Sequence, residues 1–199
     1  MYKYSKIIEI LKSKTVELRH DVDISLISAY KMAKYEKEMG VKSIYYIRFD
    51  SDYYNVLSYE SYKIINFLIE NHEIGCHVDV TNINDEIDLL NYLNRYKKII
   101  DFNKFTFHIN TEKTKLFTDV DGYLNKSILK SEYISDSKNT FNKKILNKII
   151  ELDEYTLLIH PEWWDNKDFI FNKNSKNALI SSMRHNRLKK TAINEILKK

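Results

Sequence analysis

The chain contains few of the residues that interrupt regular structure or form tight phosphate-binding loops. It has one proline and three glycines in 199 residues, and Gly40, Gly75 and Gly122 are far apart. Rossmann and P-loop nucleotide sites need closely spaced glycines, because only glycine lets the backbone approach a phosphate group. The scarcity of glycine therefore argues against both kinds of site. The absence of a Gly/Pro-rich linker favours a single domain with short loops.

Paired cysteines and long apolar runs are also missing. The single cysteine, Cys76, cannot form an intramolecular disulfide. No window approaches the roughly 20 consecutive apolar residues of a membrane span, and the N-terminal residues lack the apolar core of a signal peptide. We therefore expect a cytoplasmic protein without a membrane span.

Charge is balanced along the chain and not concentrated in one segment. The net charge is +4, from 32 basic and 28 acidic residues, and there is no block of lysine or arginine. Nucleic-acid-binding proteins usually carry a basic patch, so we expect no nucleic-acid partner. A length of 199 residues with 43% hydrophobic content fits one domain over residues 1–199. The sequence leaves the oligomeric state open.

The chain alternates between strand-like and helix-like segments. A strand-like run begins at Val16 and ends in Asp21 and Asp23, and a helical pattern follows from Ser25, a typical N-cap residue, to Gly40, a typical helix terminator. Further strands are expected at 41–49, 72–79, 104–108, 133–136 and 155–160, and further helices at 5–13, 58–71, 84–101, 141–152 and 175–199. Repeated β-α units predict an α/β fold, either a barrel or a doubly wound sheet.

Most of these strands end in a side chain that can bind a metal ion or move a proton. The strand-end residues are Asp21 and Asp23, His77 and Asp79, His108, Asp136 and His160. Ligands of α/β folds bind at the carboxyl ends of the strands, because the loops there bring side chains together over the sheet. The sequence therefore predicts one site at that edge. The loop 50–55 is expected beside it, and Cys76 is expected to point away from it into the core.

The strand-end segments resemble the motifs of a known family. Residues 19–23 (Arg-His-Asp-Val-Asp), 72–79, 134–136 and 157–164 resemble, in this order, the motifs of polysaccharide deacetylases of the NodB-homology type, carbohydrate esterase family 4. The nearest likeness is to a branch with a His-Asp-Val-Asp first motif, found among bacterial surface-polysaccharide genes. The resemblance spans about residues 16 to 164. It implies a single-domain distorted (β/α) barrel with seven or so strands.

The resemblance also implies an activity and roles for individual residues. The expected enzyme is a metal-dependent hydrolase that removes an acetyl group from an N-acylated amino sugar in bacterial surface-polysaccharide biosynthesis. Asp21 resembles the general base, His160 the general acid, and Asp136 the carboxylate that orients His160. Asp23 and His77 resemble metal ligands. The implied cofactor is a divalent transition metal, with zinc expected and cobalt, nickel or manganese as alternatives.

The sequence departs from the family pattern at one ligand. The family usually has a second histidine four residues after the first, where this chain has Thr81. We expect His108, at the end of the next strand, to be the third ligand, and Arg19 to supply positive charge near Asp21. The residues expected to contact substrate are Arg19, Asn55, Trp163 and Trp164. For the two tryptophans, simple packing against the C-terminal helix is an equally good interpretation.

Three other functions fit part of this pattern. Residues 21–25 also match the Asp-x-Asp-x-Ser/Thr motif of haloacid-dehalogenase-type phosphatases, although Arg19 and His20 stand where that class has an apolar strand. An Asp-x-Asp pair can also hold the metal of a nucleotide-sugar glycosyltransferase, which would leave the strand-end histidines without a role. The third alternative is a degenerate barrel that binds carbohydrate or a partner without catalysis, as Thr81 would allow.

Overall fold

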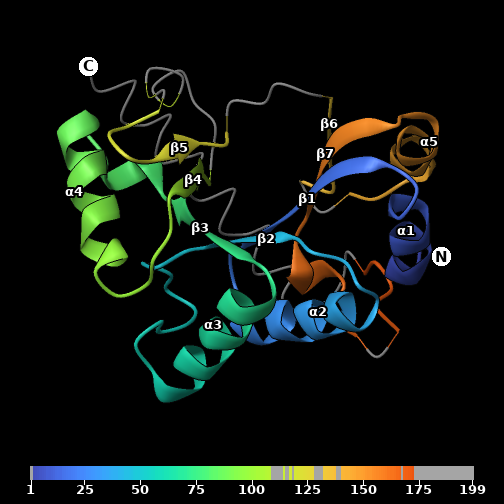
Figure 1. The fold of residues 1–199 in the computed structure, drawn as a ribbon, viewed down its shortest axis with the longest axis horizontal. Coiled ribbons are helices and arrows are strands. Elements are labelled where there is room, and N and C mark those ends of the chain that lie inside the picture. The colour runs from blue at the N-terminus through green and yellow to red at the C-terminus, as the bar shows by residue number, and fades with distance from the viewer. Residues whose placement is uncertain are drawn as a thin grey trace.

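Seven parallel strands form the centre of the structure (Figure 1). The structure is a computed structural model that describes residues 2–108, 114, 117, 119–127, 132–137, 140–166 and 168–172. The helix expected at 175–199 lies outside these residues. The strands are β1 (Thr15–Val22), β2 (Ile44–Ile47), β3 (Glu73–Val78), β4 (Lys104–Phe107), β5 (Leu124–Asn125), β6 (Tyr133–Ser135) and β7 (Glu154–Ile159). Every expected strand is present, and the two-residue strand β5 is an addition that the sequence did not predict.

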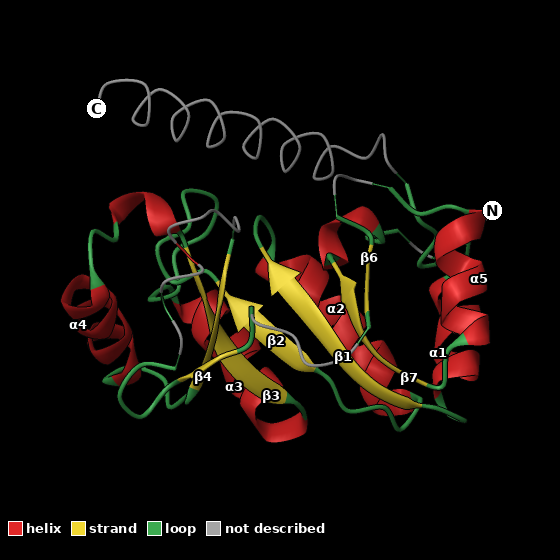
Figure 2. Cartoon of the chain, turned by 90° about the horizontal axis from the view of Figure 1, so that it is seen from above, coloured by secondary structure: helices red, strands yellow, loops and turns green. Residues whose placement is uncertain are grey.

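The strand order is β5-β4-β3-β2-β1-β7-β6, and each neighbouring pair is parallel. All carboxyl ends therefore lie along one edge of the sheet. The sheet curls into a half-barrel that is open between β5 and β6 in the described part of the chain (Figure 2). This arrangement confirms the predicted distorted (β/α) barrel with seven strands.

The helices occupy the segments where the sequence predicted them. They are α1 (Tyr4–Leu11), α2 (Leu26–Glu38), α3 (Tyr59–Asn71), α4 (Glu86–Lys97) and α5 (Lys143–Glu151), with short 3-10 turns η1 (Val80–Asn82) and η3 (Pro161–Trp163). The hydroxyl of Ser25 accepts the Ser28 N–H at 3.1 Å at the start of α2. At its end, Gly40 has φ +70°, and the N–H of Val41 donates to the Glu36 carbonyl at 2.9 Å. Glycine suits this C-terminal cap because it has no Cβ to clash at positive φ.

The two faces of the sheet have different character because side chains alternate along each strand. On one face, two clusters of buried apolar side chains pack the sheet against the helices, and Cys76 lies in the first of them, as predicted. On the other face, the polar residues of successive strands lie side by side. These residues include Arg19 and Asp21 of β1, His77 of β3 and Thr106 of β4. The curled sheet therefore encloses a polar interior that ends at the carboxyl edge.

Candidate active site

The end of β1 supplies two buried carboxylates to this polar interior. Asp21 and Asp23 are only 5% and 2% exposed. Nη2 of Arg19 donates to both oxygens of Asp21, at 3.1 and 3.0 Å, and Nη1 donates to the Lys126 carbonyl at 3.1 Å. Burial by itself raises the pKa of Asp21, but the charge of Arg19 outweighs it and lowers this pKa below its ordinary value. Asp21 is therefore ionised at neutral pH and able to accept a proton.

Asp23 lies against two imidazoles from neighbouring strands. Its Oδ1 atom is 2.9 Å from Nδ1 of His108 and 3.4 Å from Nε2 of His77, and these two nitrogens are 3.2 Å apart. The three candidate ligand atoms all lie within 4.8 Å of one another. The structure thus brings together the three residues that the sequence suggested as metal ligands.

The chemistry of these three side chains fits a transition metal. One carboxylate with two imidazoles is a common donor set for zinc, and such ligands bind in their deprotonated forms. Burial lowers the pKa of His108, although Asp23 opposes the shift. Despite its burial, Asp23 has a pKa well below its usual range, chiefly because of His108. The Nδ1 atom of His77 is 2.7 Å from the Thr106 hydroxyl, which leaves Nε2 facing the cluster.

His160 approaches the same cluster from β7. Its Nε2 atom is 4.0 Å from Oδ2 of Asp23, and its Nδ1 atom is 2.7 Å from Oδ1 of Asp136. The ring also stacks on Trp163, with centroids 4.2 Å apart. Burial opposes a positive charge on His160, but Asp136 outweighs it and raises the pKa of His160 to about 10. His160 is therefore an imidazolium at neutral pH.

The residues expected to contact substrate are placed differently from one another. Trp164 is fully buried, and its indole N–H donates to Asp136 at 2.9 Å, so the structure places it behind the carboxylate that pairs with His160. Arg19 is also buried and bonded to Asp21, which favours a positioning role over substrate contact. Asn55 is exposed, and its Oδ1 accepts the Leu57 N–H at 2.9 Å.

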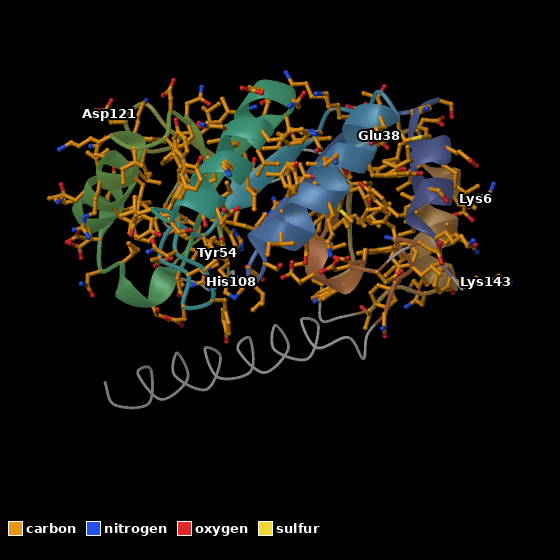
Figure 3. All side chains as sticks on the ribbon, turned by 90° about the horizontal axis from the view of Figure 1, so that it is seen from below. Lys6, Glu38, Tyr54, His108, Asp121 and Lys143 are labelled. Atoms are coloured by element: carbon orange, nitrogen blue, oxygen red, sulfur yellow. The ribbon has the colours of Figure 1, made fainter. Side chains whose placement is uncertain are left out.

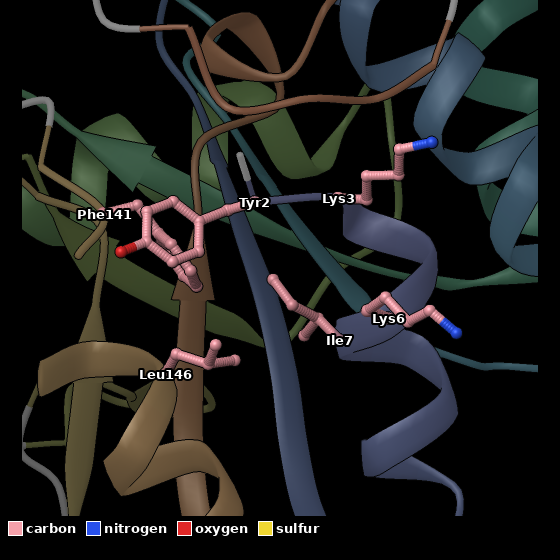
Figure 4. Close-up of a pocket in the computed structure, with 6 residues that line it drawn as sticks. All are labelled: Tyr2, Lys3, Lys6, Ile7, Phe141 and Leu146. Carbon is pink, nitrogen blue, oxygen red and sulfur yellow. The ribbon is translucent and has the colours of Figure 1, made fainter. Parts of the chain in front are cut away.

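Two cavities show where a larger ligand has room. One of about 380 Å³ is lined by residues of the 49–55 loop, including Asn55, and Ser51 of this loop donates to the Asp23 carbonyl at 3.2 Å. This cavity therefore adjoins the carboxyl end of β1. Another cavity, of about 210 Å³, lies between α1 and α5 and contains none of the candidate site residues (Figure 4).

The structure adds site residues that the sequence reasoning missed. Arg48 follows β2 and bonds to Asp79, and the buried Glu162 follows His160 in η3. Burial and Asp23 hold the pKa of Glu162 well above its usual range. A charged residue directly after the apolar run of β2 was the available signal for Arg48.

A second polar group lies behind β1, on the helix side of the sheet. The fully buried carboxylate of Glu36 accepts hydrogen bonds from side chains of α1, β1, β2 and the residue just before β2. These donors are Tyr4, His20 at 2.8 Å, Ser43 at 2.6 Å and Tyr45 at 2.8 Å. The other ring nitrogen of His20 is 3.1 Å from the Ile159 carbonyl. His20 therefore links the residues that immediately precede Asp21 and His160 in the two strands.

The fold is similar to those of solved carbohydrate esterases. A CE4 family pseudoenzyme from Bacillus anthracis matches with a TM-score of 0.55 and 14% identity, over 90% of this chain and 62% of that chain. A chitin deacetylase from the fungal pathogen Colletotrichum lindemuthianum matches with a TM-score of 0.54 and 11% identity, over 88% and 81% of the two chains. The chain has the fold of the CE4 deacetylases.

Other CE4 structures extend this likeness. A peptidoglycan deacetylase from Bacillus subtilis matches with a TM-score of 0.52 and 14% identity, over 94% of this chain and 96% of that chain. The CE4 fold confirms the expectation drawn from the strand-end motifs. This chain spans less than two thirds of the pseudoenzyme. No protein-family model and no curated protein sequence matches it. None of the helices in the described residues is long and apolar enough to cross a bilayer.

Proposed function

We propose that the protein is a metal-dependent hydrolase that removes the acetyl group from an N-acetylated amino sugar. One observation carries the proposal: a carboxylate-imidazole cluster lies between a buried carboxylate and a buried imidazolium. The cluster is Asp23, His77 and His108. The carboxylate is Asp21, with its Oδ2 atom 3.7 Å from Nε2 of His77. The imidazolium is His160.

Asp23, His77 and His108 would hold the metal ion, for which zinc is the first expectation. When bound, the metal lowers the pKa of a water molecule and provides positive charge for the oxygen of the acyl group. The hydrogen bond between His77 and Thr106 fixes the ring of His77 with Nε2 toward Asp23. Such support of a metal-binding imidazole is typical of metal sites in proteins.

Asp21 is the proton acceptor in this proposal. It is ionised at neutral pH, and the hydrogen bonds from Arg19 keep its carboxylate in one orientation beside the cluster. A carboxylate in this position can take a proton from an attacking water molecule. Each oxygen of Asp21 accepts one hydrogen bond from Arg19 and keeps a lone pair with which it can accept the proton.

His160 is the proton donor. The amine that leaves an amide is a poor leaving group unless it is protonated. His160 carries a proton on Nε2, the nitrogen that faces Asp23, because Nδ1 is bonded to Asp136. Asp21 and His160 therefore lie at the ends of adjacent strands with opposite proton-transfer roles. These roles also account for the histidines at the strand ends, which would have no function in a glycosyltransferase.

A bacterial surface-polysaccharide precursor is the substrate that we propose, because of the His-Asp-Val-Asp first motif. A carbohydrate-binding protein without catalysis is the second candidate. It is favoured by Thr81, whose hydroxyl and N–H both bond to Asp79 at 2.9 and 3.1 Å and which therefore offers no ligand. The observation that His108 lies beside Asp23 favours the enzyme.

The test measures acetate release from N-acetylglucosamine oligosaccharides together with metal content. Zinc-loaded wild-type protein should release acetate. Asp21→Asn should keep the metal and lose activity by a factor of about 10² to 10⁴, whereas His77→Ala should lose both. Asp101→Asn is the matched control, because the side chain of Asp101 is 94% exposed. Failure of the wild-type protein to retain metal and to release acetate would leave the binding protein as the better proposal.

A further inference from the structure

Arg48 lies between two of the candidate metal ligands. The last paired residues of the central strands are Val22 with Ile47 and Ile47 with Cys76. The next residues along β1, β2 and β3 are therefore Asp23, Arg48 and His77. Alternation along β2 places Arg48 on the same face as Tyr46, whose ring faces Arg19 in the polar interior.

Only one of the three guanidinium nitrogens of Arg48 has a hydrogen-bond partner among the described residues. It is buried, with a side-chain exposure of 1%, and its Nη2 atom donates to Oδ2 of Asp79 at 2.8 Å. Oδ1 of Asp79 accepts from Thr81, so the carboxylate cannot turn away. The Nε and Nη1 atoms of Arg48 have no hydrogen-bond partner among the residues that the structure describes. The backbone N–H of Arg48 donates to the Tyr54 hydroxyl at 3.1 Å, which anchors the start of the side chain as well.

A buried guanidinium group with unpaired N–H groups lowers the stability of the folded protein unless a ligand accepts hydrogen bonds from them. A buried N–H without an acceptor destabilises the folded protein, and more so when the group is charged. Buried polar atoms of this kind are rare in native proteins and often belong to functional sites. Burial opposes the charge of Arg48, but Asp23 and then Asp79 outweigh it and raise the pKa of Arg48. The group therefore stays charged beside the cluster.

We propose that Arg48 forms a carboxylate-binding subsite next to the metal cluster, with the Nε–H and Nη1–H groups donating to the oxygens of the acyl group. The subsite rests on the proposed function, because the acyl group is the part of the substrate that acquires carboxylate oxygens. In hydrolysis, water adds across the amide C–N bond. The acyl carbon keeps the water oxygen and leaves as acetate, and the nitrogen leaves as the protonated amine. Arg48 binds the acetate while Asp23, His77 and His108 hold the metal.

Acetate itself is the probe for this subsite. Its dissociation constant is measured by calorimetry on the zinc-loaded full chain, in parallel with the dissociation constant for zinc. Hydrogen bonds to a charged group contribute about 1.5–3 kcal/mol each, so Arg48→Gln should weaken acetate binding about ten- to a hundredfold and leave zinc binding intact. Arg48→Lys keeps the charge but not the second donor, so its acetate affinity should be intermediate. Arg95→Gln, at an exposed arginine of α4, should bind acetate like the wild type.

A measurement on the unaltered protein covers the case in which Arg48→Gln fails to fold. The Nε–H resonance of Arg48, assigned by its loss in Arg48→Lys, should shift in proton–nitrogen spectra as acetate is added. An unchanged resonance, or wild-type acetate affinity in a folded Arg48→Gln, would overturn the subsite. Because neither readout uses turnover, loss of the subsite is separable from loss of the proposed function. A protein that binds acetate through Arg48 but releases none from oligosaccharides would disprove only the hydrolase.

Discussion

The Nδ1 atom of His160 lies 2.7 Å from Oδ1 of Asp136, which joins the ends of β7 and β6. The same carboxylate also accepts the backbone N–H of His160 at 3.2 Å and the indole N–H of Trp164 at 2.9 Å. With three donors, Asp136 has little freedom to rotate. It therefore sets both the orientation of the imidazole and its charge, and the first prediction concerns this pair.

Replacing Asp136 with asparagine should return His160 to ordinary imidazole behaviour. In the metal-free protein the pKa of His160 is raised to about 10, and loss of the carboxylate charge should bring it toward the unperturbed value of about 6.5. His160, the proposed proton donor, would then be mostly neutral at pH 8, and the proposed deacetylation should slow by about 10²- to 10⁴-fold. Titration of the His160 ring protons by NMR measures the shift directly.

Asp136→Asn should also change how the free energy of unfolding depends on pH. A group whose pKa is raised by folding stabilises the native state fully below its unfolded pKa, and this contribution is lost as the pH rises through the folded pKa. The difference in free energy of unfolding between wild type and Asp136→Asn should therefore be largest below about pH 6.5 and shrink toward pH 10. Asp153→Asn, at an aspartate whose side chain is 96% exposed, is the control. An imidazole that still titrates near pH 10 in Asp136→Asn would contradict the assignment.

Thr106 is predicted to tune metal affinity without touching the metal. Its hydroxyl is 2.7 Å from Nδ1 of His77, and loss of such a partner typically weakens metal binding by about 10- to 100-fold. Thr106→Val keeps the shape of the side chain but removes the hydroxyl, so zinc affinity should fall by this factor. Competition with a chromophoric chelator gives the dissociation constant. Thr156→Val, the same change at a buried threonine of β7, should leave zinc affinity unchanged, and equal losses in both variants would count against the role of Thr106.

The positions of the strand-end residues could be predicted from the sequence because two local signals coincide there. Short apolar runs of strand length end in aspartate or histidine, and parallel strands must bring their carboxyl ends to one edge. His108 could be suggested as a ligand for this reason, one strand away from His77. The family resemblance then assigned roles that residue types alone leave open.

The roles of Arg48 and Glu36 were not predicted from the sequence, although the charged residue directly after the apolar run of β2 was a signal for Arg48. Each lies in an amphipathic or mixed segment where an exposed charged residue is the usual outcome. Their burial depends on which strands and helices become neighbours, and hence on the strand order. The two-residue strand β5 is too short to leave a periodic pattern, and only its pairing with β4 defines it. Trp164 was ambiguous because burial behind Asp136 and exposure to a sugar both suit an indole ring.

Gly75 is predicted to be needed for full stability and activity, because the ring of Tyr46 occupies the space that a side chain would need. A Cβ atom at Gly75 would overlap ring atoms of Tyr46, and Arg19 lies 5.1 Å from the centre of that ring. Gly75→Ala should therefore displace Tyr46 and, through Arg19, Asp21. We expect a loss of about 1–3 kcal/mol in stability, typical of overpacking, together with reduced activity and intact zinc binding.

A double-mutant cycle separates this clash from a general effect of alanine in a strand. If the overlap with Tyr46 is the cause, Gly75→Ala should cost much less in a Tyr46→Leu background, and the coupling should appear in urea unfolding. Additive effects of the two changes would show that the ring is not responsible.

Glu36 is predicted to be the largest single polar contribution to the stability of the strand that carries Asp21. Its carboxylate is fully buried and accepts from Tyr4, His20, Ser43 and Tyr45. Glu36→Gln removes the charge but keeps the shape, and it places an amide N–H against at least one donor. Breaking a buried charged network typically costs about 3–5 kcal/mol, which urea unfolding at neutral pH can resolve.

The pH dependence of stability tests whether the charge of Glu36 causes the stability loss in Glu36→Gln. Burial raises the pKa of Glu36, but His20 outweighs it and the pKa is lowered. A lowered pKa stabilises the native state above the unfolded pKa, and this contribution is lost as the pH falls through the folded pKa. The difference in free energy of unfolding between wild type and Glu36→Gln should therefore be widest at neutral pH, begin to narrow below about pH 4.3, the ordinary glutamate value, and close as the pH falls through the lower folded pKa. Glu38→Gln, at the exposed end of the same helix (Figure 3), should stay within about 0.5 kcal/mol of wild type. If Glu36→Gln has the same free energy of unfolding as Glu38→Gln, the charge of Glu36 contributes nothing to stability.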